Sequence, residues 1–337
     1  MYLRFTPFAT RWTRTAGTIL VGLWVALASP SASATLFTGT LYYTLFSGGQ
    51  NVWRVNYSYQ DSTQTFALGA PTNIASTNGA DGIIFAPNGN LLVGGQGSGN
   101  VYEVKPSNGA LVNTQATGTS SFHLTLDPNL KSVYSSDFGG SLNTLSLPIG
   151  SGSANTAITG GDSGLTQIAF GNEGTVFYVN GSPNGGGNLG TINLGTGVTT
   201  QLYTGVQSAH GLIYDPFTDL ITMFGAGETG TMNDLTGASL KTSSQIYGLG
   251  DFDQGSVDGF GHALVAGSGA ITFIDYHLSN DITKPDFTTF VRGFTGIDDL
   301  APLAGAGSNP NPVPEPQSLL LVALALAGLA VSRRKPS

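Results

Sequence analysis

The sequence contains no cysteine among its 337 residues. Disulfide bonds, thiolate nucleophiles and cysteine-ligated metal centres are therefore excluded. A chain without cysteine must take its stability from packing and hydrogen bonding.

Charged residues are also scarce, at 9% of the chain, and basic residues are the scarcer kind. Between Thr35 and Pro314 the chain has six Lys and Arg against 19 Asp and Glu, so the net charge of this region is near −13 (6 − 19). Binding to nucleic acid needs clustered Lys and Arg that neutralise phosphates. A nucleic-acid partner is therefore excluded.

Long helical patterns are missing from the region between Thr35 and Gly305, where no segment sustains a period of 3.6 residues over 11 positions. Short apolar or alternating runs are separated instead by Gly, Asn, Asp and Pro. A hydrophobic content of 40%, with 18 Phe and 12 Tyr, favours a packed fold over disorder. The pattern predicts an all-β domain with many tight turns.

A unit of about four strands recurs along this region. Its clearest copy runs from Asp81 to Asn113 and includes a Pro-Asn-Gly turn at Pro87–Gly89. The first strands of the successive copies open at intervals of 42, 44, 43, 43 and 45 residues, at Asp81, His123, Gln167, His210, Asp253 and Asp298. Four strands every 40 to 50 residues are typical of the blades of a β-propeller.

The first and last strands of this region predict how the ring closes. Five copies are complete from residue 79 to about 294, whereas 36–78 offers only three strands, at Leu41–Phe46, Asn51–Tyr57 and Gln64–Leu68. Ile297–Leu303 is an unpaired first strand. We therefore predict a six-bladed propeller closed by pairing of N- and C-terminal strands in one split blade, since a β-sandwich or β-helix would not explain these complementary fragments.

The N-terminus has the pattern of an export signal. Arg4, Arg11 and Arg14 precede an apolar stretch from Ala16 to Ala28, and small residues follow at Ser31–Ala34. We expect a signal peptide over 1–34 that signal peptidase removes, with an uncleaved anchor as the alternative. The chain is predicted to be exported in either case.

The C-terminus carries three elements in a fixed order. A Pro-rich spacer includes Pro314, Glu315 and Pro316, an apolar run follows at Leu319–Val331, and a basic cluster ends the chain at Arg333–Lys335. A helix over this run would reach about 20 Å, short of the roughly 30 Å hydrocarbon core of a bilayer. Its competing interpretation, a buried helix of a globular domain, does not account for a run that is apolar on all sides.

This tail resembles the PEP-CTERM sorting signal of bacterial envelope proteins. The resemblance implies that an exosortase recognises the tail near the Pro-Glu-Pro triplet and removes it on the outer face, so the membrane association is transient. Together with the signal peptide and the repeats, the tail divides the remaining sequence into a propeller over 35–305, a linker over 306–318 and a sorting helix with its basic stop over 319–337.

The turn sequence Gly82–Val93 also resembles the blade motif of NHL and gluconolactonase-type propellers. In hydrolases and lyases of that superfamily, carboxylate, Asn or His residues face the axial channel. None of the six strand-opening positions of this chain holds a Glu, so the catalytic set of those families does not map onto it.

The six strand-opening residues are the candidate site, because a propeller places them around its axis. Their His and Asp side chains have the chemistry to ligate a divalent ion, or to supply a general base with an orienting carboxylate. Alternatively, they tie adjacent loops through bonds to the backbone. We assign no catalytic residue and no cofactor, with an axial divalent metal as the alternative. His262 and His277 are expected to have surface or packing roles.

Two functions follow from these observations. One is a non-enzymatic binding or structural protein of the cell envelope or extracellular matrix, with an exopolysaccharide or envelope proteins as partners and with Trp53, Tyr57 and Tyr59 as candidate sugar-stacking residues. The other is a metal-dependent hydrolase or lyase that uses the axial ring of Asp and His.

Overall fold

The computed structural model of the chain describes residues 36–46, 49–246, 251–267 and 269–301. The predicted signal peptide, linker and sorting helix lie outside the described residues. Within these described ranges there is no helix of the length and hydropathy needed to cross a membrane.

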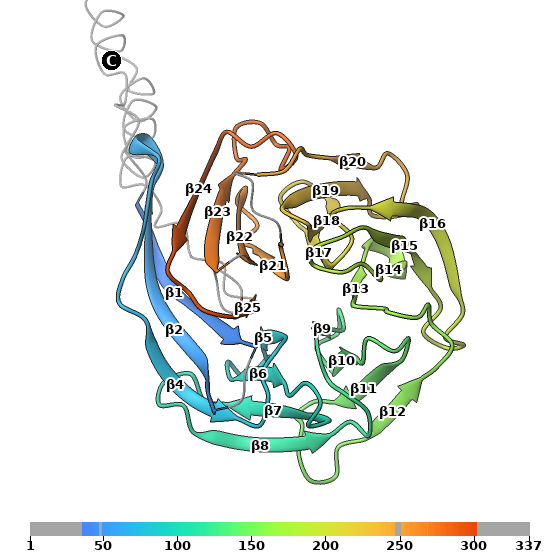
Figure 1. Cartoon of the computed structure of the whole chain (residues 1–337). Helices are drawn as coiled ribbons and strands as arrows, with labels where there is room; N and C mark the ends of the chain where they lie inside the picture. The colour runs from blue at the N-terminus through green and yellow to red at the C-terminus, as the bar shows by residue number, and fades with distance from the viewer. Residues whose placement is uncertain (1–35, 47–48, 247–250, 268, 302–337) are drawn as a thin grey trace, which may run out of the picture. The chain divides into compact units, whose positions relative to one another are not determined.

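The described residues form six small antiparallel sheets arranged as a ring, which confirms the predicted six-bladed propeller (Figure 1). We number the five complete blades 2 to 6 in chain order and call the split blade the closing blade. Blade 2 consists of β5 (Ile83–Phe85), β6 (Leu91–Gly94), β7 (Asn100–Val104) and β8 (Leu111–Ala116). Blade 3 consists of β9 (Leu124–Leu126), β10 (Ser132–Ser136), β11 (Leu142–Ser146) and β12 (Asn155–Ile158). In each blade the first strand lies nearest the centre of the ring (Figure 1).

The next three blades repeat this order. Blade 4 consists of β13 (Gln167–Phe170), β14 (Val176–Val179), β15 (Gly187–Ile192) and β16 (Thr199–Val206). Blade 5 consists of β17 (Gly211–Asp215), β18 (Leu220–Gly225), β19 (Glu228–Asn233) and β20 (Lys241–Thr242). Blade 6 consists of β21 (Gly255–Val257), β22 (His262–Gly267), β23 (Ala270–Asp275) and β24 (Phe287–Arg292). Two 3₁₀ turns, η1 (Asp61–Thr63) and η2 (Asn172–Gly174), complete the described elements.

The closing blade joins the two ends of the propeller, as predicted. Its strands are β25 (Ile297–Leu300), β1 (Leu36–Leu45), β2 (Gly49–Gln60), β3 (Thr65–Leu68) and β4 (Thr72–Thr77). Strand β25 pairs with β1 in antiparallel register, with Tyr43 opposite Leu300. The amide of Ala301 extends this pairing by donating to the Tyr42 carbonyl at 2.8 Å.

Strand β4 was not predicted. Both β3 and β4 pair with β2, β3 along its C-terminal part and β4 along its N-terminal part. Because β2 has 12 residues, its outer edge accommodates two short strands in place of one. Pro71 lies between them and has no amide hydrogen to donate, which explains why the outer strand is interrupted there.

The Pro-Asn-Gly turn shows how a blade hairpin forms locally. Gly89 adopts a positive φ of 83°, and the Ala86 amide donates to the Asn90 carbonyl at 2.7 Å to close the turn. The side-chain amides of Asn88 and Asn90 donate to the Glu103 carboxylate on the neighbouring strand, at 2.8 and 2.7 Å. The polar residues of the turn therefore satisfy a buried carboxylate of the same blade.

The hydrophobic core is divided into six clusters, and each cluster joins two neighbouring blades. At the junction of the closing blade and blade 6, for example, Tyr59 packs on Phe273 with ring centroids 4.3 Å apart. Full burial of such a side chain contributes roughly 1.5–3 kcal/mol. Tyr57 and Tyr59 are 7% and 1% exposed, so the prediction that they stack on sugars at the surface is wrong, because blade packing needs them.

Candidate functional site

The strand-opening residues lie at the inner ends of the blades, where the backbones of adjacent blades approach each other closely. At Gly211, which follows His210, an added Cβ would lie 2.6 Å from the backbone oxygen of Asp253. At Gly82 it would lie 2.6 Å from the backbone oxygen of Phe122. Glycine at these positions therefore lets the start of one inner strand approach the start of the next.

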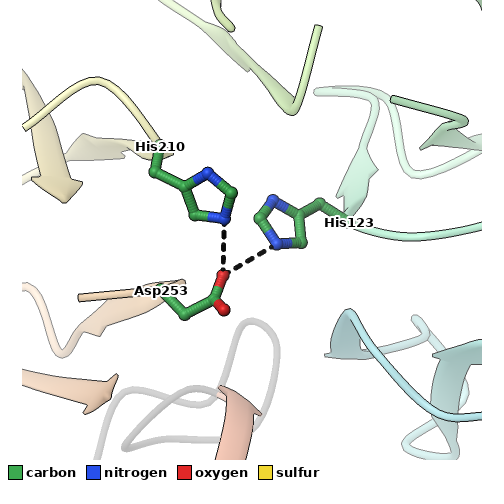
Figure 2. A group of neighbouring side chains, drawn as sticks. All are labelled: His123, His210 and Asp253. Carbon is green, nitrogen blue, oxygen red and sulfur yellow. Dashed lines mark hydrogen bonds and ion pairs between the residues drawn. The ribbon is translucent and has the colours of Figure 1, made fainter. Parts of the chain in front are cut away.

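Five of the six predicted residues lie in one group of interacting side chains. We call the following residues the axial cluster: Asp81, His123, His210, Asp253, Asp298 and Asp299. Asp253 Oδ1 is 2.8 Å from His210 Nε2 and 3.1 Å from His123 Nε2, so a single oxygen contacts both imidazoles (Figure 2). These three side chains come from blades 6, 5 and 3, respectively.

The remaining carboxyl groups of the axial cluster surround His123. Its Nε2 is 3.6 Å from Asp299 Oδ2 and 3.7 Å from Asp81 Oδ1. Asp298 interacts with Asp81 by a side-chain hydrogen bond. The side chains of His123, Asp81 and Asp299 are 1%, 3% and 0% exposed, whereas that of Asp253 is 16% exposed, so solvent reaches the cluster at Asp253.

The structure departs from the sequence-based site at two residues. Gln167 does not interact with the cluster, because its Oε1 accepts a hydrogen bond from the Leu212 amide of the next blade at 2.7 Å. Asp299, which the sequence reasoning missed, contacts His123 through Oδ2 and accepts from the Gln254 amide through Oδ1 at 3.1 Å. The adjacent aspartates Asp298 and Asp299 at the last inner strand were the sequence feature from which this contact could have been predicted.

The surroundings lower the pKa of one carboxyl group of the cluster and raise the pKa values of the other three. Burial alone would raise the pKa of Asp253, but the charges and hydrogen bonds of the two imidazoles outweigh it and hold that pKa well below its usual value. Burial also disfavours charged His210, yet the Asp253 charge raises the His210 pKa. Burial raises the pKa of Asp81, and burial with the charge of neighbouring carboxylates raises those of Asp298 and Asp299. Among these carboxyl groups the surroundings therefore favour the ionised form at Asp253 and the neutral form at Asp298 and Asp299.

A hydrogen bond to the backbone of Gly181 fixes the orientation of the His210 ring. Its Nδ1 donates to the Gly181 carbonyl at 2.5 Å, which directs Nε2 toward Asp253. The same arrangement, with one ring nitrogen donating to a carbonyl, is found in metal-binding histidines. His123, His210 and Asp253 offer ligand atoms within 4.8 Å of one another, as do Asp81, His123 and Asp299. Either set could hold a divalent cation.

A separate cavity of about 590 Å³ is lined by residues from the innermost strands of all six blades. Its lining is mainly apolar, with Ile84, Leu126, Ile168, Phe170, Ile213 and Leu300 among the contributing residues. No member of the axial cluster is part of this lining. The sequence analysis did not predict this cavity, because the repeat spacing does not show which apolar side chains of the inner strands line an open space.

His262 is buried against the rings of Phe37, Tyr59 and Phe273, and His277 is partly exposed, so both positions agree with the packing and surface roles expected of them, but both rings also contact carboxylates. His262 Nδ1 is 2.7 Å from Asp258 Oδ2, and His277 Nδ1 is 2.6 Å from Asp275 Oδ1. Both rings therefore interact directly with carboxylates in blade 6, and they form a second group of His and Asp residues.

Comparison with known families identifies the tail. Residues 312–335 match the model of the PEP-CTERM protein-sorting motif. The tail is a PEP-CTERM sorting signal. This confirms the prediction made from Pro314, Glu315 and Pro316, and it implies export to the cell envelope or extracellular space with processing by an exosortase. A comparison with curated proteins found no match.

Solved structures resemble the propeller over most of its length. One chain of a nidogen/laminin complex is 12% identical with a TM-score of 0.58, and the alignment covers 79% of this chain and 98% of that one. A protein from Lactobacillus plantarum is 10% identical with a TM-score of 0.52, covering 78% and 99%. A putative 6-phosphogluconolactonase from Bacteroides fragilis is 13% identical with a TM-score of 0.49, covering 79% and 84%. At these identities the likeness shows the fold alone.

Proposed function

We propose that this protein is an exported, non-enzymatic binding propeller of the cell envelope or extracellular space, which takes a small apolar molecule into its axial cavity. The observation that carries the proposal is the cavity of about 590 Å³ with its mainly apolar lining. Small-molecule sites are typically concave, apolar and about 300–1,000 Å³ in volume. The PEP-CTERM signal supports the location.

The few polar groups of the lining would orient the ligand. Thr125, Gln167 and Gln254 contribute hydroxyl and amide groups from blades 3, 4 and 6. Gln254 Oε1 is buried and has no hydrogen-bond partner, so an acceptor for a ligand donor is available. An apolar molecule with one hydroxyl or amide group fits this combination.

A binding role agrees better than catalysis with the placement of the titratable groups. The imidazoles and carboxylates of the axial cluster are buried against one another and do not line the cavity. A general acid or base must lie within hydrogen-bond reach of the reacting atom. The axial cluster does not meet this condition for a substrate held in the cavity, and the hydrolase or lyase alternative that uses this cluster is therefore not favoured.

A role in the extracellular matrix, with an exopolysaccharide or an envelope protein as a further partner, belongs to the same proposal. The sorting signal would bring the protein to a location where such partners are present. Of the three aromatic residues considered for sugar stacking, only Trp53 is partly exposed. Sugar binding through a cluster of these three aromatics is not part of the proposal.

Filling the cavity tests the proposal. We expect the purified protein to bind the neutral apolar probe N-phenylnaphthylamine with a rise in fluorescence, and Ile213→Trp to weaken this binding by about tenfold or more, equivalent to ~1.4 kcal/mol. The matched control is Val198→Trp, because Val198 is 62% exposed and lies outside the cavity lining. Absence of probe binding by the unmodified protein, or equal binding by both folded variants, would refute the assignment.

The sorting signal predicts a processed product. We expect a mature chain from about Thr35 to near Pro314 in a host with an exosortase, and replacement of Pro314, Glu315 and Pro316 by Ala should leave the tail attached. Intact-mass analysis of the exported protein measures this directly. An unmodified product that retains Leu319–Val331 would contradict processing at the motif.

A further inference from the structure

We propose that His262, Asp275 and His277 form a binding site for a divalent transition-metal ion, at the junction of blade 6 with the closing blade. The three residues offer ligand atoms that lie within 4.8 Å of one another. This site is independent of the axial cavity and of the axial cluster, with which it shares no residue.

The first observation is the hairpin register that brings the ligands together. His262 opens β22 and lies directly opposite Asp275, the last residue of β23. Directly opposed residues in an antiparallel pair have Cβ atoms about 4.5–5.5 Å apart. His277 follows two residues after Asp275, and its backbone amide donates to Asp275 Oδ1 at 3.1 Å. The backbone therefore fixes all three residues at one end of the hairpin.

The second observation is an unsatisfied ring nitrogen. The His262 side chain is 4% exposed, and its Nδ1 lies 2.7 Å from Asp258 Oδ2. Its Nε2 is buried without a hydrogen-bond partner, at 3.9 Å from Asp275 Oδ1. When the His262 ring is neutral and its Nδ1–H donates a hydrogen bond to Asp258, the lone pair of Nε2 faces a carboxylate oxygen of Asp275. A bound cation would give His262 Nε2 the partner that it lacks.

The carboxylate behind His262 completes the arrangement seen around metal-binding histidines. Asp258 Oδ1 accepts from the backbone amides of Phe260 and His262, at 2.7 and 3.1 Å, so the carboxylate is itself held in place. A positioned carboxylate fixes the ring tautomer and raises the basicity of the ligating nitrogen. Asp258 is thus a positioning residue for the proposed site.

His277 provides access from solvent. Its side chain is 27% exposed, whereas that of Asp275 is 1% exposed. An ion could therefore enter past His277 and reach the buried groups behind it. Two imidazole nitrogens and one carboxylate oxygen suit Zn²⁺, Co²⁺, Ni²⁺ or Cu²⁺, while Ca²⁺ and Mg²⁺ prefer sets of oxygen ligands. The fourth position of a tetrahedral ion would be left for water.

The closing blade contacts this site through its own side chains. The Tyr59 hydroxyl donates to Asp275 Oδ2, and the rings of Phe37 and Tyr59 lie 4.9 and 5.4 Å from the His262 ring. Asp61 Oδ1 is 3.8 Å from His277 Nε2. All three proposed ligands belong to blade 6, and the closing blade surrounds the site through Tyr59, Phe37 and Asp61.

Cobalt(II) titration of the purified protein tests the site, because tetrahedral Co²⁺ with nitrogen and oxygen ligands absorbs visible light. We expect one equivalent to bind with this absorption, and Zn²⁺ to displace it and to raise the melting temperature by several degrees. His277→Ala should abolish the absorption and the melting shift, and His262→Gln should do the same. Since His277 is partly exposed, its variant remains folded and keeps the test valid if His262→Gln does not fold.

The control variant is His123→Gln, which removes one imidazole of the axial cluster and leaves the proposed site intact. We expect it to retain the Co²⁺ absorption. Loss of binding in His123→Gln together with full binding in His277→Ala would place the metal at the axis and overturn the proposal. Absence of stoichiometric Co²⁺ and Zn²⁺ binding by the unmodified protein would also overturn it.

Discussion

A chain that ends at Gly296 is expected to lose cooperative folding, because it lacks β25. This strand contributes Ile297 and Leu300, which are 8% and 2% exposed, to the core shared by the closing blade and blade 6. Loss of two such side chains and of the pairing with β1 costs on the order of 5 kcal/mol, comparable to the total stability of many domains. Thermal unfolding followed by circular dichroism should show a broad transition at markedly lower temperature, or aggregation.

The control for this truncation is a chain that ends at Gly305 and keeps β25. Equal melting of the two truncations would show that β25 does not close the ring. A point substitution gives the same test in the full chain: Leu300→Ala should cost about 2–5 kcal/mol. Leu278→Ala should change stability by less than about 0.5 kcal/mol, because Leu278 is 75% exposed.

The architecture could be predicted because blade structure is encoded locally and repeatedly. The spacing of 42 to 45 residues between strand-opening positions, with turns such as Pro87–Gly89, gave the inner strands, and the unpaired Ile297–Leu303 gave the closure. The interruption of the outer strand at Pro71 was missed. The length of β2, which decides whether one or two strands fit along its edge, depends on pairing with β1 and not on its own sequence alone.

The candidate site was less predictable than the fold. The repeat position of Gln167 predicted that it lies at the axis, but its side-chain oxygen accepts a hydrogen bond from the Leu212 backbone amide instead of contacting the cluster. Asp299 joined the cluster because the short strand β25 buries both members of the acidic doublet, at 6% and 0% exposure. Repeat position thus predicts which residues approach the axis, whereas the partners of each side chain depend on its neighbours in the adjacent blades.

The second group of histidines could have been found from hairpin register. His262 and Asp275 are equally far along the sequence from Gly267 and Ala270, which pair with each other, so the register of the two strands makes them direct partners. The interaction of Tyr59 with Asp275 could not be inferred in the same way, since these residues are 216 positions apart in different blades. Only ring closure brings them together.

Asp253→Asn is expected to be the most destabilising conservative substitution in the axial cluster. Asp253 lies 2.8 and 3.1 Å from the two imidazoles, and its lowered pKa with the raised pKa of His210 favours an ion pair, whose negative charge the amide would remove. Loss of one partner from a buried ion pair typically costs about 3–5 kcal/mol. Urea unfolding at neutral pH should show a reduction of this size in the free energy of unfolding.

Asp298→Asn is the matched control, since it makes the same chemical change at the same position of another blade. Burial and neighbouring carboxylates raise the pKa of Asp298 well above its usual value, which favours a neutral carboxyl group in the folded protein. An amide replaces a neutral carboxyl with little loss, and we expect a change below about 1 kcal/mol. Equal losses in the two variants, or a larger loss in Asp298→Asn, would show that the negative charge of the cluster does not reside on Asp253.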